Sequence, residues 1–390
     1  MTSAPDPAPP PGDDSDDRDT FLSHPQFHRT FTVNPTPENG FTTPFTVKYA
    51  DFGDTSSSNV LLFFGPLMGS RFIQTPKHAL ALRQHIRIID VDRPGMGGSD
   101  PAPAGERLRI WRVVIPSLLA HLSIPYVSVA AHSGGTIYAL DFAVSHPELL
   151  FPPVGGDGSG KGGYLALGCP WILPSHTGSA LLGFVGMLPK GLISRTDSLA
   201  RLIATRVGPA IGVSSGLVMK MIPTSLFKSA PAGTEGGEEE VDEDWEFENG
   251  IWGRVIDKMY EGGVEGISED ALLFMKKGDA ESGWGEWGDY DRLVPRLVEG
   301  LRASGRKLRV DVFYAEKDHM IGDAGSKGAV WFDGCWEPEG GEYGDVLEYR
   351  KKTIKGADHD SIWSMRWNVA REVLGRVGEN GQEAASNLSE

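Results

Sequence analysis

Cysteine is scarce in this chain of 390 residues, which contains only Cys169 and Cys335. The two lie far apart and lack the C-x-x-C spacing of thiolate metal sites. A disulfide scaffold and a zinc site built on paired cysteines are therefore excluded. Such sparing use of cysteine fits a reducing compartment.

Long hydrophobic runs are also missing. The longest apolar tracts, residues 180–188 and 207–222, are too short, or too interrupted by glycine, proline and lysine, to span a bilayer. The first twenty residues have neither the basic start nor the apolar centre of a secretory signal. We therefore expect a cytoplasmic protein without a transmembrane segment.

Basic residues are in deficit, with 37 Lys and Arg against 53 Asp and Glu, which gives a formal net charge of −16. Most of this charge lies in two segments. Residues 1–20 carry six Asp and one Arg, and residues 235–248 carry nine acidic and no basic side chains. The remainder is nearly neutral, so the acidity says little about a substrate, but it argues against nucleic acid and anionic membranes as partners.

Short apolar runs alternate with helical patterns along most of the chain. This alternation predicts βαβ units and a mostly parallel sheet flanked by helices, an α/β fold. A hairpin of residues 31–33 and 45–50 precedes it, because two β-prone runs flank a turn rich in Pro, Asn and Gly. The predicted buried strands are residues 60–64, 86–91 and 127–130, and residues 164–167, 308–314 and 346–354 are predicted as further strands of the sheet.

The alternation stops between the fourth and fifth of these strands, where helical segments and an acidic low-complexity tract follow. Helices inserted there predict a cap over the carboxyl edge of the sheet, where ligands bind. The predicted organisation is a disordered acidic and proline-rich arm (1–24), an α/β core (25–169 and 295–378), a helical cap (170–294) with a disordered acidic loop (230–248), and a disordered tail (379–390).

Ser133 stands where a strand would deliver a nucleophile. The apolar run from Val127 to Ala130 precedes it, and a helical pattern over residues 136–144 follows. A sharp turn between strand and helix strains the backbone at the serine and requires small residues two positions before and after it. Ala131 and Gly135 meet that requirement. An ordinary turn serine is the alternative.

A serine hydroxyl needs a histidine to take its proton and a carboxylate to orient that histidine. Asp318 follows the predicted strand 308–314, and His359 follows the strand that ends near residue 354. Both therefore lie at carboxyl ends of strands, the edge at which Ser133 is presented. The alternative for His359 is a surface histidine, since other histidines are available.

Four motifs occur in the order expected of one family: residues 92–100, 131–135, 315–318 and 356–359. On these motifs the sequence resembles the capped, esterase-like α/β-hydrolases. The resemblance implies Ser133 as nucleophile, His359 as general base and then acid, and Asp318 as the orienting carboxylate. It implies a small-molecule acyl substrate and neither metal nor cofactor.

The resemblance also implies an oxyanion hole made by the N–H of Gly134 and one N–H from the loop after the first buried strand. Where the family usually has His-Gly-X, this loop reads Phe-Gly-Pro-Leu-Met, and Pro66 has no N–H to donate. We therefore predict Leu67 as the second donor, or Met68 if the register is shifted. Trp171 and Met187, from the cap, are predicted to line the substrate pocket.

The predicted reaction is hydrolysis of a small or medium apolar ester, thioester or amide through an acyl-enzyme. A non-catalytic ligand-binding protein on the same fold is the alternative that Pro66 favours, and C–C hydrolysis or acyl transfer is another. The aspartate-nucleophile dehalogenases and epoxide hydrolases are disfavoured, because serine occupies the elbow.

Overall fold

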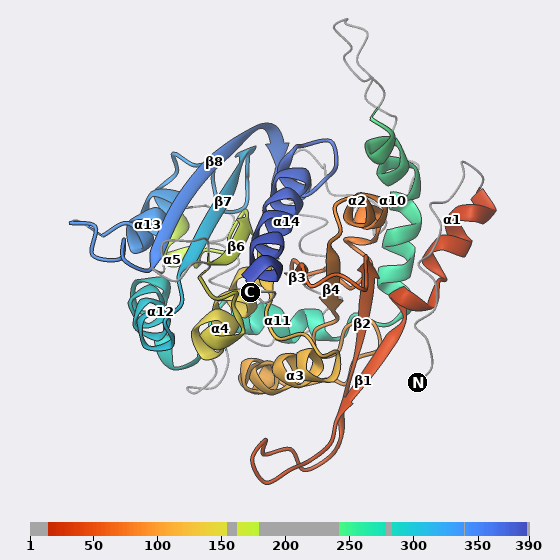
Figure 1. Cartoon of the computed structure of the whole chain (residues 1–390), viewed down its shortest axis with the longest axis horizontal. Helices are drawn as coiled ribbons and strands as arrows, with labels where there is room; N and C mark the ends of the chain where they lie inside the picture. Colours follow the sequence, from red (N-terminus) through yellow and green to blue (C-terminus); the bar gives the residue numbers. More distant parts are fainter. Residues whose placement is uncertain (1–14, 154–161, 179–241, 278–282, 339, 388–390) are drawn as a thin grey trace, which may run out of the picture.

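An eight-stranded sheet forms the centre of the computed structural model, which describes residues 15–153, 162–178, 242–277, 283–338 and 340–387 (Figure 1). The strand order is β1-β2-β4-β3-β5-β6-β7-β8. The strands are β1 (Arg29–Val33), β2 (Phe45–Gly53), β3 (Val60–Phe64), β4 (Arg87–Val91), β5 (Ser128–His132), β6 (Gly163–Gly168), β7 (Leu308–Lys317) and β8 (Leu347–Asp358).

The sheet is mixed but mostly parallel. β1 and β2 form the antiparallel hairpin that the sequence predicts, and β2 also runs antiparallel to β4. Every pair from β4 through β3, β5, β6 and β7 to β8 is parallel. The six strands predicted after the hairpin are confirmed as β3 to β8, with small shifts of their ends. The α/β fold class is therefore confirmed.

Helices cover both faces of the sheet. On one face α14 contacts β3 and β6 while α2 contacts β2 and β4; on the other, α4 contacts β3 and β5 and packs against α3 and α12. Figure 1 draws α12, α4 and α3 as a row. The bounds are α2 (His78–Arg83), α3 (Arg107–His121), α4 (Gly135–Ser145), α12 (Tyr290–Ser304), α13 (Lys327–Trp336) and α14 (Val369–Asn387), with 3-10 turns η1 (Pro25–Phe27), η2 (Thr75–Lys77), η3 (Ala104–Glu106) and η4 (Pro147–Leu149).

The insertion between β6 and β7 is helical in its described parts. It contains α5 (Pro174–Thr177), α10 (Glu243–Glu261), α11 (Gly266–Phe274) and η8 (Gly285–Trp287), and it leads into α12. α12 crosses the predicted boundary between cap and core at residues 294 and 295. The cap boundaries themselves remain a prediction.

Three segments predicted to be disordered are helical where the structure describes them. Residues 15–22 form α1 (Ser15–Leu22), α10 begins at Glu243, and α14 continues to Asn387. The prediction is wrong there because average composition hides a few apolar residues: Phe21 and Leu22 at the end of α1 are buried in the core. The rest of these segments (1–14, 230–241 and 388–390) lies outside the described residues.

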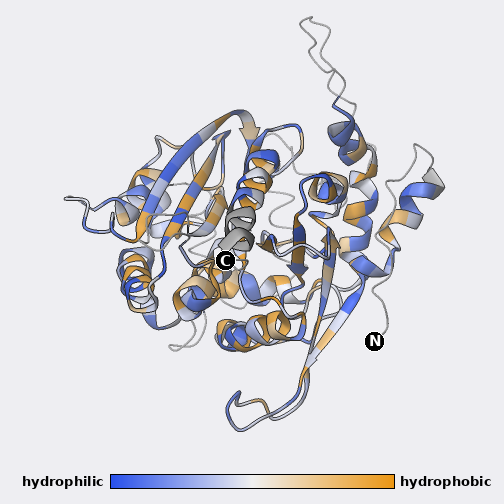
Figure 2. Ribbon diagram, in the orientation of Figure 1, coloured by the Kyte–Doolittle hydropathy of each residue, from blue (hydrophilic) through white to orange (hydrophobic). Residues whose placement is uncertain are grey.

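Hydrophobic and hydrophilic residues are distributed according to the position of each strand in the sheet (Figure 2). The central strands β3, β5 and β6 are buried along their whole length, whereas most of the edge strand β8 is exposed and hydrophilic. Among the described residues, no helix is long and apolar enough to cross a membrane.

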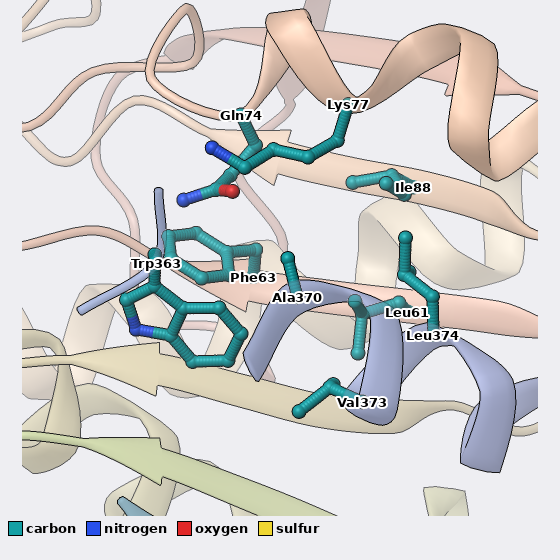
Figure 3. A pocket seen from close by; sticks show the side chains of 9 residues that line it. All are labelled: Leu61, Phe63, Gln74, Lys77, Ile88, Trp363, Ala370, Val373 and Leu374. Carbon is teal, nitrogen blue, oxygen red and sulfur yellow. The ribbon is translucent and has the colours of Figure 1, made fainter. Parts of the chain in front are cut away.

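A small pocket lies between the sheet and α14 (Figure 3). It is mostly apolar, with Gln74 and Lys77 as the polar members of its lining. None of the residues predicted to act in catalysis lines it. The lining residues are Leu61, Phe63, Gln74, Lys77, Ile88, Trp363, Ala370, Val373 and Leu374.

Candidate active site

Ser133 lies in a sharp turn between β5 and α4. β5 ends at His132, α4 begins at Gly135, and Ser133 itself has φ 51°, in the left-handed region that side chains other than glycine rarely adopt. The Ser133 N–H donates to the Gly168 carbonyl at 3.0 Å, which anchors the turn to the neighbouring strand. The backbone strain is therefore held by the surrounding structure, as expected of a nucleophile elbow.

Small residues are required around the elbow because the end of β3 packs against it. A Cβ at Gly135 would overlap the carbonyl oxygen of Phe64 and lie 2.6 Å from that of Gly65. Ala131 is completely buried. The end of β3 thus packs directly on the first turn of α4, and only glycine fits at position 135.

Ser133, His359 and Asp318 meet at the carboxyl edge of the sheet. The Ser133 hydroxyl donates to His359 Nε2 at 2.9 Å, and His359 Nδ1 donates to Asp318 Oδ2 at 2.8 Å. Their exposed fractions are 4%, 6% and 6%. Asp318 Oδ1 accepts the N–H groups of Met320 and Ile321, both at 2.9 Å, so the carboxylate is held on both oxygens. Three side chains distant in sequence therefore form one continuous hydrogen-bonded chain.

The electrostatics of this chain favour an ion pair between histidine and aspartate. Burial alone would lower the pKa of His359, but the charge and hydrogen bond of Asp318 outweigh it and raise that pKa above its ordinary value of 6.5. Burial would raise the pKa of Asp318, but His359 and the two backbone N–H groups outweigh it and lower that pKa. Asp318 is thus suited to stabilise an imidazolium.

His132 forms a hydrogen bond to the backbone of the site. Its Nε2–H donates to the carbonyl of His359 at 2.8 Å. Burial, with a further contribution from the charge of His359, lowers the pKa of His132 to about 3. A neutral imidazole can therefore hold the loop that carries His359 without competing for the proton of Ser133.

Cys169 is a neighbour of the triad that sequence reasoning missed. Its Sγ lies within 4.8 Å of the ligand atoms of Asp318 and His359. Burial, with the negative charge of Asp318, raises the pKa of the thiol well above its usual range, so the thiol stays protonated and neutral. The end of β6 was passed over because Gly168, Cys169 and Pro170 offer no carboxylate. No sequence signal marks a thiol that lies beside a carboxylate from the next strand.

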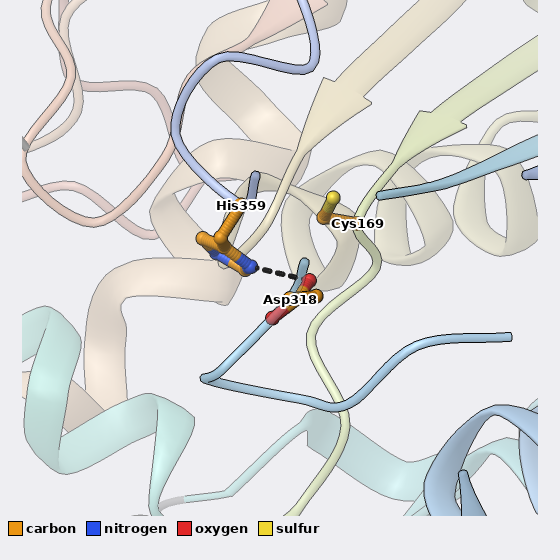
Figure 4. A group of neighbouring side chains, drawn as sticks. All are labelled: Cys169, Asp318 and His359. Atoms are coloured by element: carbon orange, nitrogen blue, oxygen red, sulfur yellow. Dashed lines mark hydrogen bonds and ion pairs between the residues drawn. The ribbon is translucent and has the colours of Figure 1, made fainter. Parts of the chain in front are cut away.

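The ligand atoms of Cys169, Asp318 and His359 lie within 4.8 Å of one another, close enough to share a metal ion (Figure 4). However, Asp318 and His359 are already joined by a proton, which a cation would have to displace. The close approach of Asp318 and His359 is therefore better explained by their hydrogen bond than by a metal centre.

The two predicted oxyanion donors lie in the elbow and in the loop after β3. Gly134 directly follows Ser133, and the start of the loop that carries Leu67 touches the elbow, where the carbonyls of Phe64 and Gly65 lie against Gly135. Among the described residues, the N–H groups of Gly134 and Leu67 have no hydrogen-bond acceptor. They are therefore free to receive one.

Aromatic side chains cover the elbow from the cap side. The Phe274 ring, at the end of α11, lies so close to Gly134 that a Cβ there would overlap it. Trp171 donates its backbone N–H to the Ser133 carbonyl at 3.2 Å and its indole N–H to the Phe274 carbonyl at 3.1 Å. The structure thus places Trp171 next to the nucleophile. Met187 lies outside the described residues.

Comparison with protein-family models gave no match, and comparison with curated proteins gave none. Solved structures do match, and three have the same fold: an epoxide hydrolase, VrEH1, from Vigna radiata (13% identity, TM-score 0.51, 90% of this chain and 97% of that chain), a VrEH2 mutant in complex with SNO (14%, 0.52, 90% and 98%), and a hydrolase from Pseudomonas aeruginosa PA01 (13%, 0.50, 90% and 98%). Such low identities establish the architecture and leave the reaction open. Together with the strand order and the elbow, they show that this chain has the α/β-hydrolase fold.

Proposed function

We propose that this protein is a serine hydrolase that cleaves a small or medium apolar ester, thioester or amide through an acyl-enzyme. One observation carries the proposal: a serine at a strained elbow, hydrogen-bonded at 2.9 Å to a histidine that is itself hydrogen-bonded at 2.8 Å to a buried aspartate. This arrangement activates a hydroxyl that is otherwise a weak nucleophile.

In the proposed reaction, the Ser133 oxygen attacks the substrate carbonyl carbon while its proton moves to His359 Nε2. Asp318 stabilises the imidazolium so formed and keeps Nδ1 protonated. When the tetrahedral intermediate collapses, the bond to the leaving group breaks, and His359 gives its proton to that group. Water, deprotonated by His359, then attacks the acyl-enzyme and releases the acid and free Ser133.

The N–H groups of Gly134 and Leu67 would stabilise the oxyanion of both tetrahedral intermediates. Their lack of an acceptor among the described residues supports this assignment, because an oxyanion hole must be ready before the charge develops. Pro66 removes one potential donor but leaves the N–H of the next residue available.

The surroundings of Ser133 favour an apolar acyl group. Phe274 and Trp171 lie against the elbow with their rings 5.9 Å apart, and both are almost completely buried. A charged acyl chain placed there would lose its hydration without gaining a partner. The proposed substrates are therefore uncharged on the acyl side.

The proposal is tested with p-nitrophenyl esters of increasing acyl length and a matched pair of serine variants. Ser133→Ala should abolish hydrolysis. Ser128→Ala, at the start of the same strand, removes a buried hydroxyl that has no hydrogen-bond partner among the described residues and should leave hydrolysis unchanged. Tight binding of an ester without turnover would support the non-catalytic alternative, and full activity of Ser133→Ala would reject the proposal.

A further inference from the structure

We propose that Arg93 is a positioning residue that holds the oxyanion loop in its working conformation, and that the cap helix α11 holds Arg93 through Asp270. In this account the cap and the oxyanion hole are mechanically connected. The inference rests on the proposed serine hydrolase function, which it deepens by assigning a residue that touches neither the substrate nor the reacting atoms.

The guanidinium of Arg93 binds three successive carbonyls of the loop after β3. Nη1 donates to the Gly65 carbonyl at 2.6 Å, and Nη2 donates to the Pro66 carbonyl at 2.5 Å and the Leu67 carbonyl at 3.0 Å. Arg93 itself is buried. One rigid, planar cation therefore fixes the orientation of three peptide planes.

The orientation of these planes determines where the N–H groups point. In a trans peptide the C=O and the following N–H point in opposite directions, and no peptide bond in the described part of the chain is cis. The N–H groups of Leu67 and Met68 therefore point away from Arg93. Since the loop rests on the elbow at Gly135, Arg93 and the elbow hold it from two sides.

Asp270 of α11 anchors Arg93 in turn. Arg93 Nε donates to Asp270 Oδ2 at 2.6 Å, while Oδ1 accepts from Arg107 Nε at 2.7 Å and from the Tyr138 hydroxyl at 2.6 Å. All four side chains are buried. Burial would raise the pKa of Asp270, but the two arginines and the Tyr138 hydrogen bond outweigh it and lower that pKa, so the carboxylate stays charged.

α11 also rests on the loop that carries Arg93. The Gly266 N–H donates to the Gly95 carbonyl at 2.9 Å, and there is no room for a Cβ at Gly266 beside the Pro94 carbonyl. A shift of α11 would thus move Asp270 and the Arg93 loop together. The Leu67 and Met68 N–H groups would then change the direction in which they point.

Arg107 provides a matched control. It is as buried as Arg93 and shares the Asp270 carboxylate, but its other bonds go to the carbonyls of Ala102 and Pro94 and to Tyr138, away from the oxyanion loop. A purely structural role of this cluster would make substitutions of the two arginines equivalent. A positioning role makes them different.

The experiment compares Arg93→Lys with Arg107→Lys in the full chain, using kcat, KM and the affinity of an alkyl boronic acid, which mimics the tetrahedral intermediate. A lysine ammonium has only three donors on a compact point charge, so it cannot bind the three carbonyls and Asp270 together as the planar guanidinium of Arg93 does. We expect Arg93→Lys to lower kcat and boronic acid affinity by about 10²-fold, the scale of one lost oxyanion donor. KM and the midpoint of the pH profile should stay the same, and Arg107→Lys should change kcat by less than about threefold. Equal losses in both variants, or none in folded Arg93→Lys, would overturn the inference.

Hydrogen exchange gives a readout that does not need activity. The Gly69 N–H donates to the Pro66 carbonyl at 2.8 Å, and the Arg71 N–H donates to Asp92 Oδ1 at 2.6 Å. A peptide covering residues 66–72 should exchange faster in Arg93→Lys and not in Arg107→Lys. Should Arg93→Lys fail to fold, Asp270→Asn gives the same comparison. If the wild type is inactive but shows this exchange pattern, the serine hydrolase proposal is rejected while the role of Arg93 in holding the loop stands. If exchange in Arg93→Lys is unchanged, the role of Arg93 in holding the loop is rejected.

Discussion

The proton balance of the triad is set by residues that touch His359 from two sides. Asp318 raises the pKa of His359, and His132, held neutral by its burial, donates to the His359 carbonyl without adding charge. A general base must be neutral to accept the proton of Ser133. Activity should therefore rise with pH through the pKa of His359.

The midpoint of that rise is the first prediction. In the wild type, kcat/KM should increase with a midpoint above 6.5, the ordinary pKa of histidine, because Asp318 stabilises the protonated form. Asp318→Asn should move the midpoint to lower pH and reduce kcat by about 10⁴, since the wrong tautomer of His359 then dominates. Steady-state kinetics across pH measure both. A midpoint that does not move in Asp318→Asn would contradict the assigned pairing.

The second prediction concerns the glycine at the elbow. Gly135→Ala should lower the melting temperature and the activity, because its Cβ would meet the backbone carbonyls of Phe64 and Gly65, which cannot rotate away as a side chain can. Gly253→Ala, in α10, is the control: no atom lies within 4 Å of its added Cβ, and alanine should stabilise the helix by up to about 1 kcal/mol. Thermal unfolding measures the melting temperatures of both variants. Melting temperatures that shift in the same direction in the two variants would contradict this packing.

Individual site residues can be predicted from the sequence only where a local pattern marks them. The small residues around Ser133 and the strand ends before Asp318 and His359 are local patterns, and the structure brings these side chains together. Cys169 and Phe274 could not be placed in the site, because nothing in their own segments indicates a neighbour that comes from another strand or from the cap.

At the scale of elements, β4 carries a buried acid with no evident partner. One carboxylate oxygen of Asp90 has no hydrogen bond among the described residues, and burial, with the nearby negative charge of Asp92, raises the pKa of Asp90 well above its usual range. An acid whose pKa is raised by folding favours the folded state below its unfolded pKa of about 3.8. That contribution is lost as pH rises through the folded pKa.

The third prediction follows from the direction of this pH dependence. Asp90→Asn removes the titration, so the stability of the variant relative to the wild type should increase as pH rises above about 4, by at most about 1.4 kcal/mol for each pH unit. Other titrating groups are common to both proteins and cancel in the difference. Urea unfolding at several pH values measures it, and a difference that does not change with pH would show that Asp90 has an ordinary pKa.

The cap helix α10 is tied to the segment after His359 by a buried ion pair. Lys77 Nζ lies 2.6 Å from Glu248 Oε1, and the other oxygen of Glu248 accepts from the Ser364 hydroxyl and the Met365 N–H, both at 2.7 Å. Lys77 and Glu248 are almost completely buried. One carboxylate thus connects α10, η2 and the segment that follows His359.

The fourth prediction uses this pair. Glu248→Leu should lower the free energy of unfolding by about 3–5 kcal/mol, because it leaves Lys77 buried without its partner. The double variant Lys77→Met, Glu248→Leu should lose much less than the sum of the single variants, since both charges leave together. Chemical unfolding of the four proteins completes the cycle. Additive losses would mean that the two charges do not interact.

Some elements differ from the sequence prediction for physical reasons. Between β3 and β4 the α-helix is confined to His78–Arg83 and is preceded by the 3-10 turn η2, because Pro76 cannot donate within a longer helix. α10 begins inside the acidic tract, where Asp242 accepts the Trp245 N–H as an N-cap. Average composition described that tract as a loop and overlooked its capping residue.

For the whole molecule, periodicity was sufficient to predict the sheet, and the cap could not be derived beyond its helical character. A buried strand can be predicted from its apolar run, whereas the contacts that join the cap to the core are made by residues far apart in sequence. Arg93 and Asp270 are 177 positions apart, and Lys77 and Glu248 are 171 apart. No pattern within either segment specifies such partners, so the link between α11 and the oxyanion loop emerges only from the folded chain.

An activated Ser133 should react with a fluorophosphonate probe, and peptide mass spectrometry of the labelled protein locates the adduct. We expect one adduct, located on Ser133, which is absent in Ser133→Ala and forms far more slowly in His359→Ala. Folded wild-type protein that gives no adduct, or an adduct on a different serine, would contradict the assignment of Ser133 as the nucleophile.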